Sequence, residues 1–479
     1  MAPTISKEGK DCLLHHIQSD IQSSFPSTCK ISWPKASCNN RWLNITSGSY
    51  HKTMISLHKK YGPVVRFAPN DLTETSHLPK KIKKFMVMSS KGKPYFSKGQ
   101  PTILVRKPTL ALFQQEIRLS IEKSENPFLM RLVRKRFGYK RKWGYGIWTC
   151  SFLKSINWYN WLTFDIIGDL AFGESFDAVE SEGHSWISLI LSTVHLMAIM
   201  EIFRRFPFFM NSFFKKIATI LMPKDLKEKS KVHFQNSMQK ATRRMKRGNN
   251  DRDDFFSHLR LPREKEKGPK ITREFILAQF NTLIVAGSET TATFLIGVTY
   301  YLLNRPETLR RLQEEIRNAF TSSEDITSDS TAALLYLAAV IEEGLRIYPP
   351  VPMGLPRECP GAMIDGHYVP KARLSASLAM LLLIMKNISP TPMNFILRDI
   401  YLLLTHFMIL DIKMITKMQV NPFLWVPEHD WGLIWLLARL AWEFDWELKS
   451  KELNWERDSK LVVLWKKPAL RVGFTPVER

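Results

Sequence analysis

The chain has 479 residues, of which 44% are hydrophobic and 24% charged, and it contains 29 Phe and 14 Trp. This composition excludes a wholly disordered chain and predicts a packed hydrophobic core. The length would accommodate about three average domains or one large helical domain. Five cysteines in so long a chain exclude a disulfide framework, and none forms a CxxC metal motif, so a reducing compartment is expected.

The formal net charge of +24 is concentrated at one end of the chain. Residues 1–150 contain 27 Lys and Arg against 8 Asp and Glu, a net charge of +19. The basic runs within residues 80–142 could attract anionic lipid, nucleic acid or an acidic protein partner. Because no nucleic-acid-binding motif organises these residues, a solvated tract is favoured over a specific binding face.

The first 57 residues show no sustained hydrophobic period and are expected to be poorly ordered, without a membrane anchor. Two apolar stretches are candidates for a membrane span, but residues 186–200 are interrupted by His195, and residues 374–385 are shorter than the ~18 residues that a membrane-spanning helix needs. The sequence therefore predicts a protein that is soluble or peripheral to a membrane.

Ordered structure is expected from residue 58 onward. A turn at Gly62 and Pro63 precedes a short apolar run at residues 64–67, which predicts a strand. Residues 79–148 again lack a pattern. The segment WYNWLTFDIIGDLAF, residues 158–172, has apolar residues at helical spacing, and Gly173 is expected to end that helix.

The longest predicted helix runs from Thr272, a candidate N-cap, to about Leu303, where Asn304 and Pro306 end it. Two further helices are predicted within residues 306–320 and 331–350. Residues 352–370 are rich in Pro and Gly, with short Val, Ile and Tyr pieces that suggest a small sheet. The fold class is therefore mainly α with a small β part.

The long helix contains the motif AGSETT, residues 286–291. Gly287 in a helix interior costs about 1 kcal/mol relative to Ala, so its missing side chain calls for an explanation. One helix face can present a small-residue notch beside the Thr290 hydroxyl, with Glu289 adjacent, to position a small ligand and relay protons. The alternative is a helix-helix contact through the small residues, with Thr290 bonded back to a carbonyl. The spacing alone leaves both open.

The second motif is EEGLRIYPP, in which Glu343 and Arg346 lie three residues apart on one helix. Residues at this spacing face one another and can form a charge-assisted hydrogen bond. On an exposed helix such a pair stabilises little. Because this helix is apolar nearly all round, the pair is expected to be buried and bonded to further partners.

Taken together, these motifs resemble the cytochrome P-450 family of heme-thiolate monooxygenases, in particular fungal microsomal members of secondary metabolism. AGSETT on a long helix is followed in the family's order by EEGLRIYPP, LPR and DGHYVP. HKKYGPVVRFAPNDL resembles the family's early strand, and LARLAWEFDWEL with LWKKPALRV resembles its closing helix and strands. The resemblance covers residues 58–76, 156–390 and 435–476, and it implies one large helical domain over residues 58–479.

The resemblance also implies an activity. Such a protein would carry heme b and hydroxylate an apolar small molecule, using O2 and electrons from NADPH through an NADPH-cytochrome reductase. It would reside at the endoplasmic reticulum membrane, with peripheral contact only, or in the cytoplasm, because no anchor is predicted.

The resemblance assigns roles to individual residues. Thr290 and Glu289 would deliver protons to bound oxygen, and Ala286 and Gly287 would border the oxygen groove.

Three further residues have implied roles at the cofactor. Glu343 and Arg346 would form a structural lock behind the heme. Arg357 would contact a heme propionate, a role that its planar guanidinium suits, with a surface arginine as the alternative.

The family's metal ligand is missing from this sequence. The family holds its heme on a cysteine in a loop of pattern FxxGxRxCxG, because thiolate donation favours cleavage of the O–O bond. No such loop occurs, and no cysteine follows Cys359. Cys359 comes shortly after Arg346 in the predicted β region, so it does not take the ligand's place. No residue is therefore assigned as a metal ligand.

The codons suggest an origin for the missing loop. The nucleotides that encode residues 408–429 can also be read one base earlier. Met and Trp, which have a single codon each, fix part of that reading, and the free third bases of the other codons allow HDPRYQNDNKNASQPFSLGPRA. This sequence resembles the family's approach to its heme loop. At Asp430 the shifted codon would be a stop, and resemblance in the printed frame resumes near Trp435. We hypothesise that residues from about 400 to 432 are translated out of frame.

Three hypotheses follow from the sequence. The first is a heme monooxygenase. The second is a catalytically dead homologue or frameshifted product without thiolate-bound heme. The third is a basic protein that binds membrane or nucleic acid through residues 80–142, although no specific nucleic-acid partner is indicated.

Overall fold

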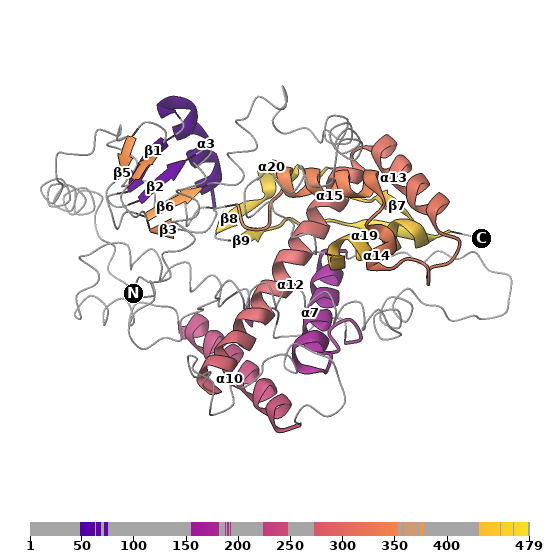
Figure 1. Ribbon diagram of the computed structural model, residues 1–479, viewed down its shortest axis with the longest axis horizontal. Coiled ribbons are helices and arrows are strands. Elements are labelled where there is room, and N and C mark those ends of the chain that lie inside the picture. Colours follow the sequence, from indigo (N-terminus) through magenta and orange to yellow (C-terminus); the bar gives the residue numbers. More distant parts are fainter. Residues whose placement is uncertain are drawn as a thin grey trace, which may run out of the picture. The chain divides into compact units, whose positions relative to one another are not determined.

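The computed structural model describes residues 48–62, 64–68, 71–74, 155–181, 187, 189–190, 192, 224–247, 273–352, 357–358, 362–364, 367–369, 374–377, 431–450, 452–462 and 464–477. Within these residues the architecture is mainly helical with a few small sheets, as the sequence predicts (Figure 1). The segments 79–148 and 400–430, in which the sequence shows no readable pattern or a suspected frame error, lie outside the described residues.

The described residues divide into two compact units. The first unit contains a four-stranded sheet of order β1-β2-β6-β3, in which β2 and β6 run parallel and the other pairs antiparallel. Strands β4 and β5 form a separate hairpin within the region for which the sequence predicted a small sheet. The elements of this unit are α3 (Tyr50–Tyr61), β1 (Val64–Ala68), β2 (Asp71–Glu74), β3 (Arg357–Glu358), β4 (Ala362–Ile364), β5 (His367–Val369), β6 (Leu374–Ser377) and β8 (Lys460–Val462).

Helix α3 begins at Tyr50, so the expected end of the poorly ordered segment after residue 57 falls inside a helix. Its buried residues include Tyr50, Met54 and His58, which share one face at a spacing of four. The sequence missed this helix because His51 and His58, which are polar, fill two of its four buried positions. The expectation of one domain over residues 58–479 stays a prediction.

The second unit is built around two helices, α7 and α12, which pack along each other. It also contains the antiparallel pair β7 and β10, in which Val472 lies opposite Leu448. The elements of this unit are α7 (Ser155–Phe172), α10 (Lys224–Arg247), α12 (Arg273–Leu303), α13 (Pro306–Ala319), α14 (Ser328–Thr331), α15 (Leu335–Ile347), α19 (Trp431–Glu443), β7 (Phe444–Leu448), α20 (Trp455–Asp458), β9 (Leu464–Lys466) and β10 (Val472–Pro476).

The predicted ends of α7 and α12 and the predicted start of α13 are confirmed, whereas α7 begins at Ser155, three residues before the predicted segment. Helix α7 ends at Phe172, and Gly173 follows with a positive φ of 66° while its N–H bonds to the Asp169 carbonyl at 2.9 Å. Helix α12 ends at Leu303, and Pro306 is the first residue of α13. Thr272, the candidate N-cap, lies outside the described residues.

Aromatic contacts and a buried hydrogen bond join α7 to α12. The rings of Phe172 and Phe280 lie 5.1 Å apart, and both side chains are fully buried. Closer to the other end of the interface, the Tyr159 hydroxyl and the Thr299 hydroxyl are 2.9 Å apart in a buried hydrogen bond. Figure 1 shows α12 as the long helix that passes beside α7 toward α15.

Polar side chains of α13 form hydrogen bonds with backbone carbonyls of α19 and β7. Gln313 donates to the Phe444 carbonyl at 3.0 Å, and Arg317 donates to the same carbonyl at 2.9 Å and to the Ala441 carbonyl at 3.2 Å. Arg317 also pairs with Asp445 at 2.8 Å. These bonds satisfy carbonyl groups at the end of α19, which would otherwise lack partners. The segment that follows the suspected frame error is therefore an integral part of the second unit.

Candidate functional site

The AGSETT motif lies in the middle of α12, and its residues divide between two sides of the helix. Ala286 is exposed and Thr290, one turn later, is half-buried. Ser288 and Glu289 are buried, with 5% and 4% of their surface exposed. Because successive residues on a helix point about 100° apart, Glu289 and Thr290 do not share a face.

Gly287 allows α7 to approach α12 closely. A Cβ atom built on Gly287 would lie 2.6 Å from Cδ1 of Ile167, which is buried in α7. The glycine therefore has a packing role, as the helix-contact alternative predicted. Ala286 lies on the exposed side of the same turn.

The Thr290 hydroxyl is bonded to its own helix. Its Oγ1 donates to the Ala286 carbonyl at 2.5 Å. This is the back-bond that the alternative interpretation predicted. The same geometry places the hydroxyl on the Ala286 side of α12.

Glu289 faces the C-terminal strands instead. Its carboxylate forms an ion pair with Lys467, and the exposed fractions of the two side chains are 4% and 6%. Lys467 Nζ also donates to the Thr293 hydroxyl at 2.8 Å, and that hydroxyl donates to Glu289 Oε1 at 3.3 Å. The sequence analysis missed Lys467, and only the lysine's place in LWKKPALRV, a segment that resembles the family, could have drawn attention to it.

Glu343 and Arg346 form the predicted ion pair on α15, and it is buried. The guanidinium donates two hydrogen bonds to the carboxylate, at 2.6 and 2.7 Å. Glu343 is completely buried and the Arg346 side chain is 10% exposed. Between them Gly344 lets α12 approach, since a Cβ there would lie 3.0 Å from the Phe294 ring and 3.1 Å from Val298. The pair is therefore held in the core between helices.

The side chains of the remaining predicted residues lie outside the described part of the chain. Arg357 lies in strand β3 of the first unit, and its side chain is outside the described part of the chain. Cys359 and the basic runs of residues 80–142 are also outside it.

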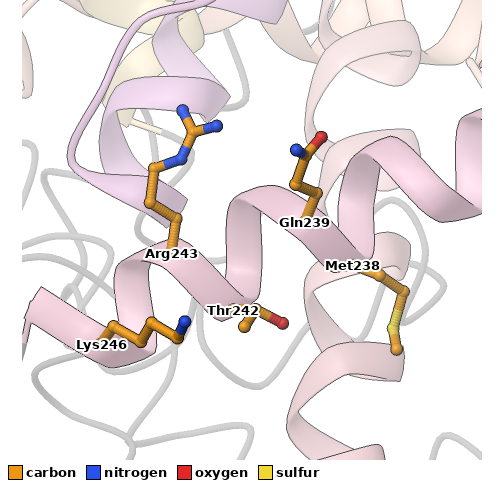
Figure 2. Close-up of a pocket in the computed structure, with 5 residues that line it drawn as sticks. All are labelled: Met238, Gln239, Thr242, Arg243 and Lys246. Carbon is orange, nitrogen blue, oxygen red and sulfur yellow. The ribbon is translucent and has the colours of Figure 1, made fainter.

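One open groove of about 420 Å³ lies elsewhere in the second unit. Figure 2 shows that its five lining side chains all leave the single helix α10. Two of its lining side chains, Arg243 and Lys246, are positively charged. The Arg243 guanidinium lies 3.7 Å from the carboxylate of Glu174, on the segment that follows α7. None of its lining residues is a predicted site residue. They are Met238, Gln239, Thr242, Arg243 and Lys246.

One described helix segment, Leu283–Leu303 of α12, is long and apolar enough to cross a membrane by length and composition. Of its apolar window, 61% is buried inside the protein. The core position of α12 between α7 and α15 accounts for this apolar character.

The sequence of this chain was compared with known proteins. Residues 33–374 match the family model of cytochrome P450. The chain belongs to the cytochrome P450 family. Its fold is accordingly the mainly helical P450 fold, and the family is one of oxidoreductases that act as monooxygenases.

Three relatives from fungi illustrate the similarity. The cytochrome P450 monooxygenase BOA3 of Botryotinia fuckeliana is 34% identical over 90% of this chain and 87% of its own length. The cytochrome P450 monooxygenase btcC of Colletotrichum orbiculare is 31% identical over 91% of this chain and 86% of its own. The trichothecene C-15 hydroxylase of Fusarium sporotrichioides is 30% identical over 91% of this chain and 89% of its own length. The family assignment does not favour a basic membrane- or nucleic-acid-binding protein.

The P450 family implies a heme, and the residues of this chain were tested against it. No cysteine follows Cys359 in the sequence, so no thiolate is available between residue 359 and α19, where the family's ligand loop would lie. Among the described residues, no group of three or more His, Cys, Asp or Glu is placed to hold a metal ion. By its sequence the chain therefore lacks, after residue 359, a cysteine that a heme-thiolate centre would need.

Proposed function

We propose that the gene of this chain specifies a heme-dependent monooxygenase that hydroxylates an apolar small molecule, with O2 and electrons from an NADPH-dependent reductase. The observation that carries the proposal is the AGSETT turn of α12, where the Thr290 hydroxyl and the Ala286 carbonyl lie together on the side away from the buried Glu289. The printed name of the trichothecene C-15 hydroxylase supports hydroxylation as the reaction.

We propose the following roles for the chain's residues. Thr290 holds a proton at its Oγ1 and passes it toward the exposed side of α12, with Glu289 as the acid of the same turn. Ala286 and Gly287 border the oxygen groove, where Ala286 presents only a methyl group to the exposed side and Gly287 lets α7 approach the same turn. Arg346 and Glu343 hold α15 against α12, and Arg357 is assigned to a propionate of heme b.

The chain as written lacks the axial thiolate, and we propose that a frame error over residues 400–432 is the reason. The packing of α19, β7 and β10 in the second unit supports this proposal, because elements before and after residues 400–432 bond to each other there. The printed polypeptide is then an inactive product of a gene for an active enzyme.

Sequencing the transcript across this region tests the frame proposal directly. One uninterrupted exon whose other frame lacks FSLGPRA would contradict it. The chain as written and the frame-restored chain are then expressed, and carbon monoxide is added to each after reduction. The Soret shift of a thiolate-bound heme is expected for the restored chain alone. Its absence from both would contradict the proposed function.

We also propose that the enzyme works at the endoplasmic reticulum membrane, where an NADPH-cytochrome reductase supplies the electrons. Cell fractionation of the frame-restored enzyme from a fungal host tests the location. Recovery in the microsomal fraction is expected, and recovery in the cytosol would contradict it.

A further inference from the structure

The ion pair between Lys467 and Glu289 joins α12 to the segment after β9. Both side chains are almost completely buried, although their residues are 178 positions apart in the sequence. Thr293 completes the cluster, because its hydroxyl accepts from Lys467 and donates to Glu289. All three polar groups thus satisfy one another in the interior.

The lysine is placed by the aromatic side chain two residues before it. Trp465 is 4% exposed, stacks on Tyr348 with ring centroids 4.6 Å apart, and donates from Nε1 to the Pro349 carbonyl at 2.7 Å. Tyr348 in turn packs against Gly297 of α12, where a Cβ would lie 2.5 Å from its ring. Burial raises the pKa of the Tyr348 hydroxyl, and the nearby charge of Glu289 raises it further. The lysine therefore reaches Glu289 from a rigid support.

The bonds of Glu289 and Thr290 point to opposite ends of the helix. The Glu289 carboxylate is bonded to Thr293, four residues ahead. The Thr290 hydroxyl is bonded to the Ala286 carbonyl, four residues behind. The acid and the hydroxyl, which are adjacent in the sequence, are thus separated by the contacts that each makes.

The stability of the fold alone does not call for such a pair. Replacing a buried ion pair by apolar residues of similar volume is often neutral or stabilising, because the charges lose their hydration on burial. What a buried pair does provide is a fixed orientation of each side chain, since any other orientation leaves a charge without a partner.

We infer that Lys467 is a positioning residue, which holds the carboxylate of Glu289 on the Thr293 side of α12 and away from Thr290. The role of this positioning in proton transfer rests on the proposed function. A proton can pass from Glu289 toward the Thr290 hydroxyl only after the carboxylate leaves Lys467, so the ion pair controls when the acid takes part.

The first experiment uses the chain as written. Lys467→Met is compared with Lys466→Met, a matched control because Lys466 is the exposed neighbour of Lys467. Unfolding by urea is expected to show a fall of about a hundredfold in the folded-to-unfolded ratio for Lys467→Met and little change for the control. The double variant Lys467→Met/Glu289→Gln is expected to recover most of the loss.

A crystal structure of each variant shows whether Lys467 sets the orientation of the Glu289 carboxylate. In Lys467→Met the Glu289 carboxylate is expected to leave Thr293, whereas Lys467→Arg is expected to keep it there. If Lys467→Met does not fold, the structure of the double variant is used, and residue 289 should again leave Thr293. A residue 289 that remains on Thr293 without the lysine would overturn the inference.

The frame-restored enzyme provides the functional readout. With reductase present, peroxide released per NADPH oxidised is expected to change severalfold in Lys467→Met and to return toward the parent value in Lys467→Arg. Equal values for Lys467→Met and Lys466→Met would overturn the inference. Failure of the proposed function would appear differently, as no NADPH oxidation by the parent enzyme itself.

Discussion

The two buried ion pairs of the second unit are built in opposite ways. Glu343 and Arg346 lie three residues apart on α15, so the helix itself brings them together. Glu289 and Lys467 come from α12 and from the segment after β9, and they meet only when the C-terminal elements pack against the helix. The first pair therefore reports on local structure and the second on the completed fold.

The difference has a consequence for how each pair can fail. The local pair persists wherever α15 is helical, and what makes it important is burial by its neighbours. The long-range pair depends on the position of Trp465 and on everything that anchors β9. Four predictions follow from this contrast.

Breaking the local pair is expected to have the largest effect. Arg346→Met removes both hydrogen bonds that the buried Glu343 carboxylate accepts from the guanidinium, which should lower the free energy of unfolding by about 3–5 kcal/mol. Denaturant unfolding measures it. Arg310→Met is the control, since Arg310 and Glu307 have the same spacing on α13 but are exposed, and little change is expected. Equal losses in the two variants would show that burial does not distinguish the pairs.

Disturbing the support of the long-range pair comes next. Gly297→Ala places a Cβ 2.5 Å from the Tyr348 ring, on which Trp465 stacks. Such overpacking should destabilise the protein by about 1–3 kcal/mol in thermal unfolding. Gly287→Ala is the comparison, because its Cβ would meet an aliphatic side chain, at 2.6 Å from Cδ1 and 3.0 Å from Cγ1 of Ile167, and the substitution gains about 1 kcal/mol of helix propensity. A smaller loss for Gly297→Ala than for Gly287→Ala would contradict this account of the support.

A third prediction concerns Glu342, which precedes Glu343 of the local pair on α15. Glu342 is half-buried, and the removal of water around it raises its pKa to about 7 from an ordinary 4.5. Because the folded state binds the proton more tightly, the contribution of Glu342 to stability is present below pH 4.5 and is lost as the pH rises through 7.

The variant Glu342→Gln isolates this effect. It should be more stable than the parent above pH 7, by about 1–3 kcal/mol after allowance for partial exposure, and the advantage should vanish near pH 4. Unfolding free energies measured across this pH range provide the check. A pH-independent difference would mean that Glu342 does not titrate in this window.

The smallest expected effect concerns an uncharged long-range contact. Tyr159→Phe removes the buried hydrogen bond to Thr299 and should cost about 1–2 kcal/mol, because it leaves the threonine hydroxyl without its partner. The double variant Tyr159→Phe/Thr299→Val should recover part of this loss, since both groups are then apolar. Additive losses in the double variant would argue against the bond.

Much of the second unit could be predicted from the sequence because its signals are local. The apolar spacing of residues 158–172 and the glycine after them defined α7 and its end. Asn304 and Pro306 marked the boundary between α12 and α13. Helix α3 was missed because its buried face contains His51 and His58, whose burial no hydrophobic pattern shows.

The site illustrates the same limit at the level of single residues. The spacing of Glu343 and Arg346 predicted their bond, because an α-helix always places residues three apart on one side. The role of Gly287 was left open, since whether the space beside a glycine holds a ligand or another helix depends on what packs there. The structure fills that space with Ile167.

The sequence by itself determined the family motifs, the mainly helical fold, the buried pair on α15 and the absence of a cysteine after Cys359. Only the tertiary structure decided that Glu289 turns away from Thr290 and toward Lys467. The physical reason is that a helix fixes the direction in which each side chain leaves the backbone, whereas the partner that a buried charge finds depends on distant segments that packing brings to it.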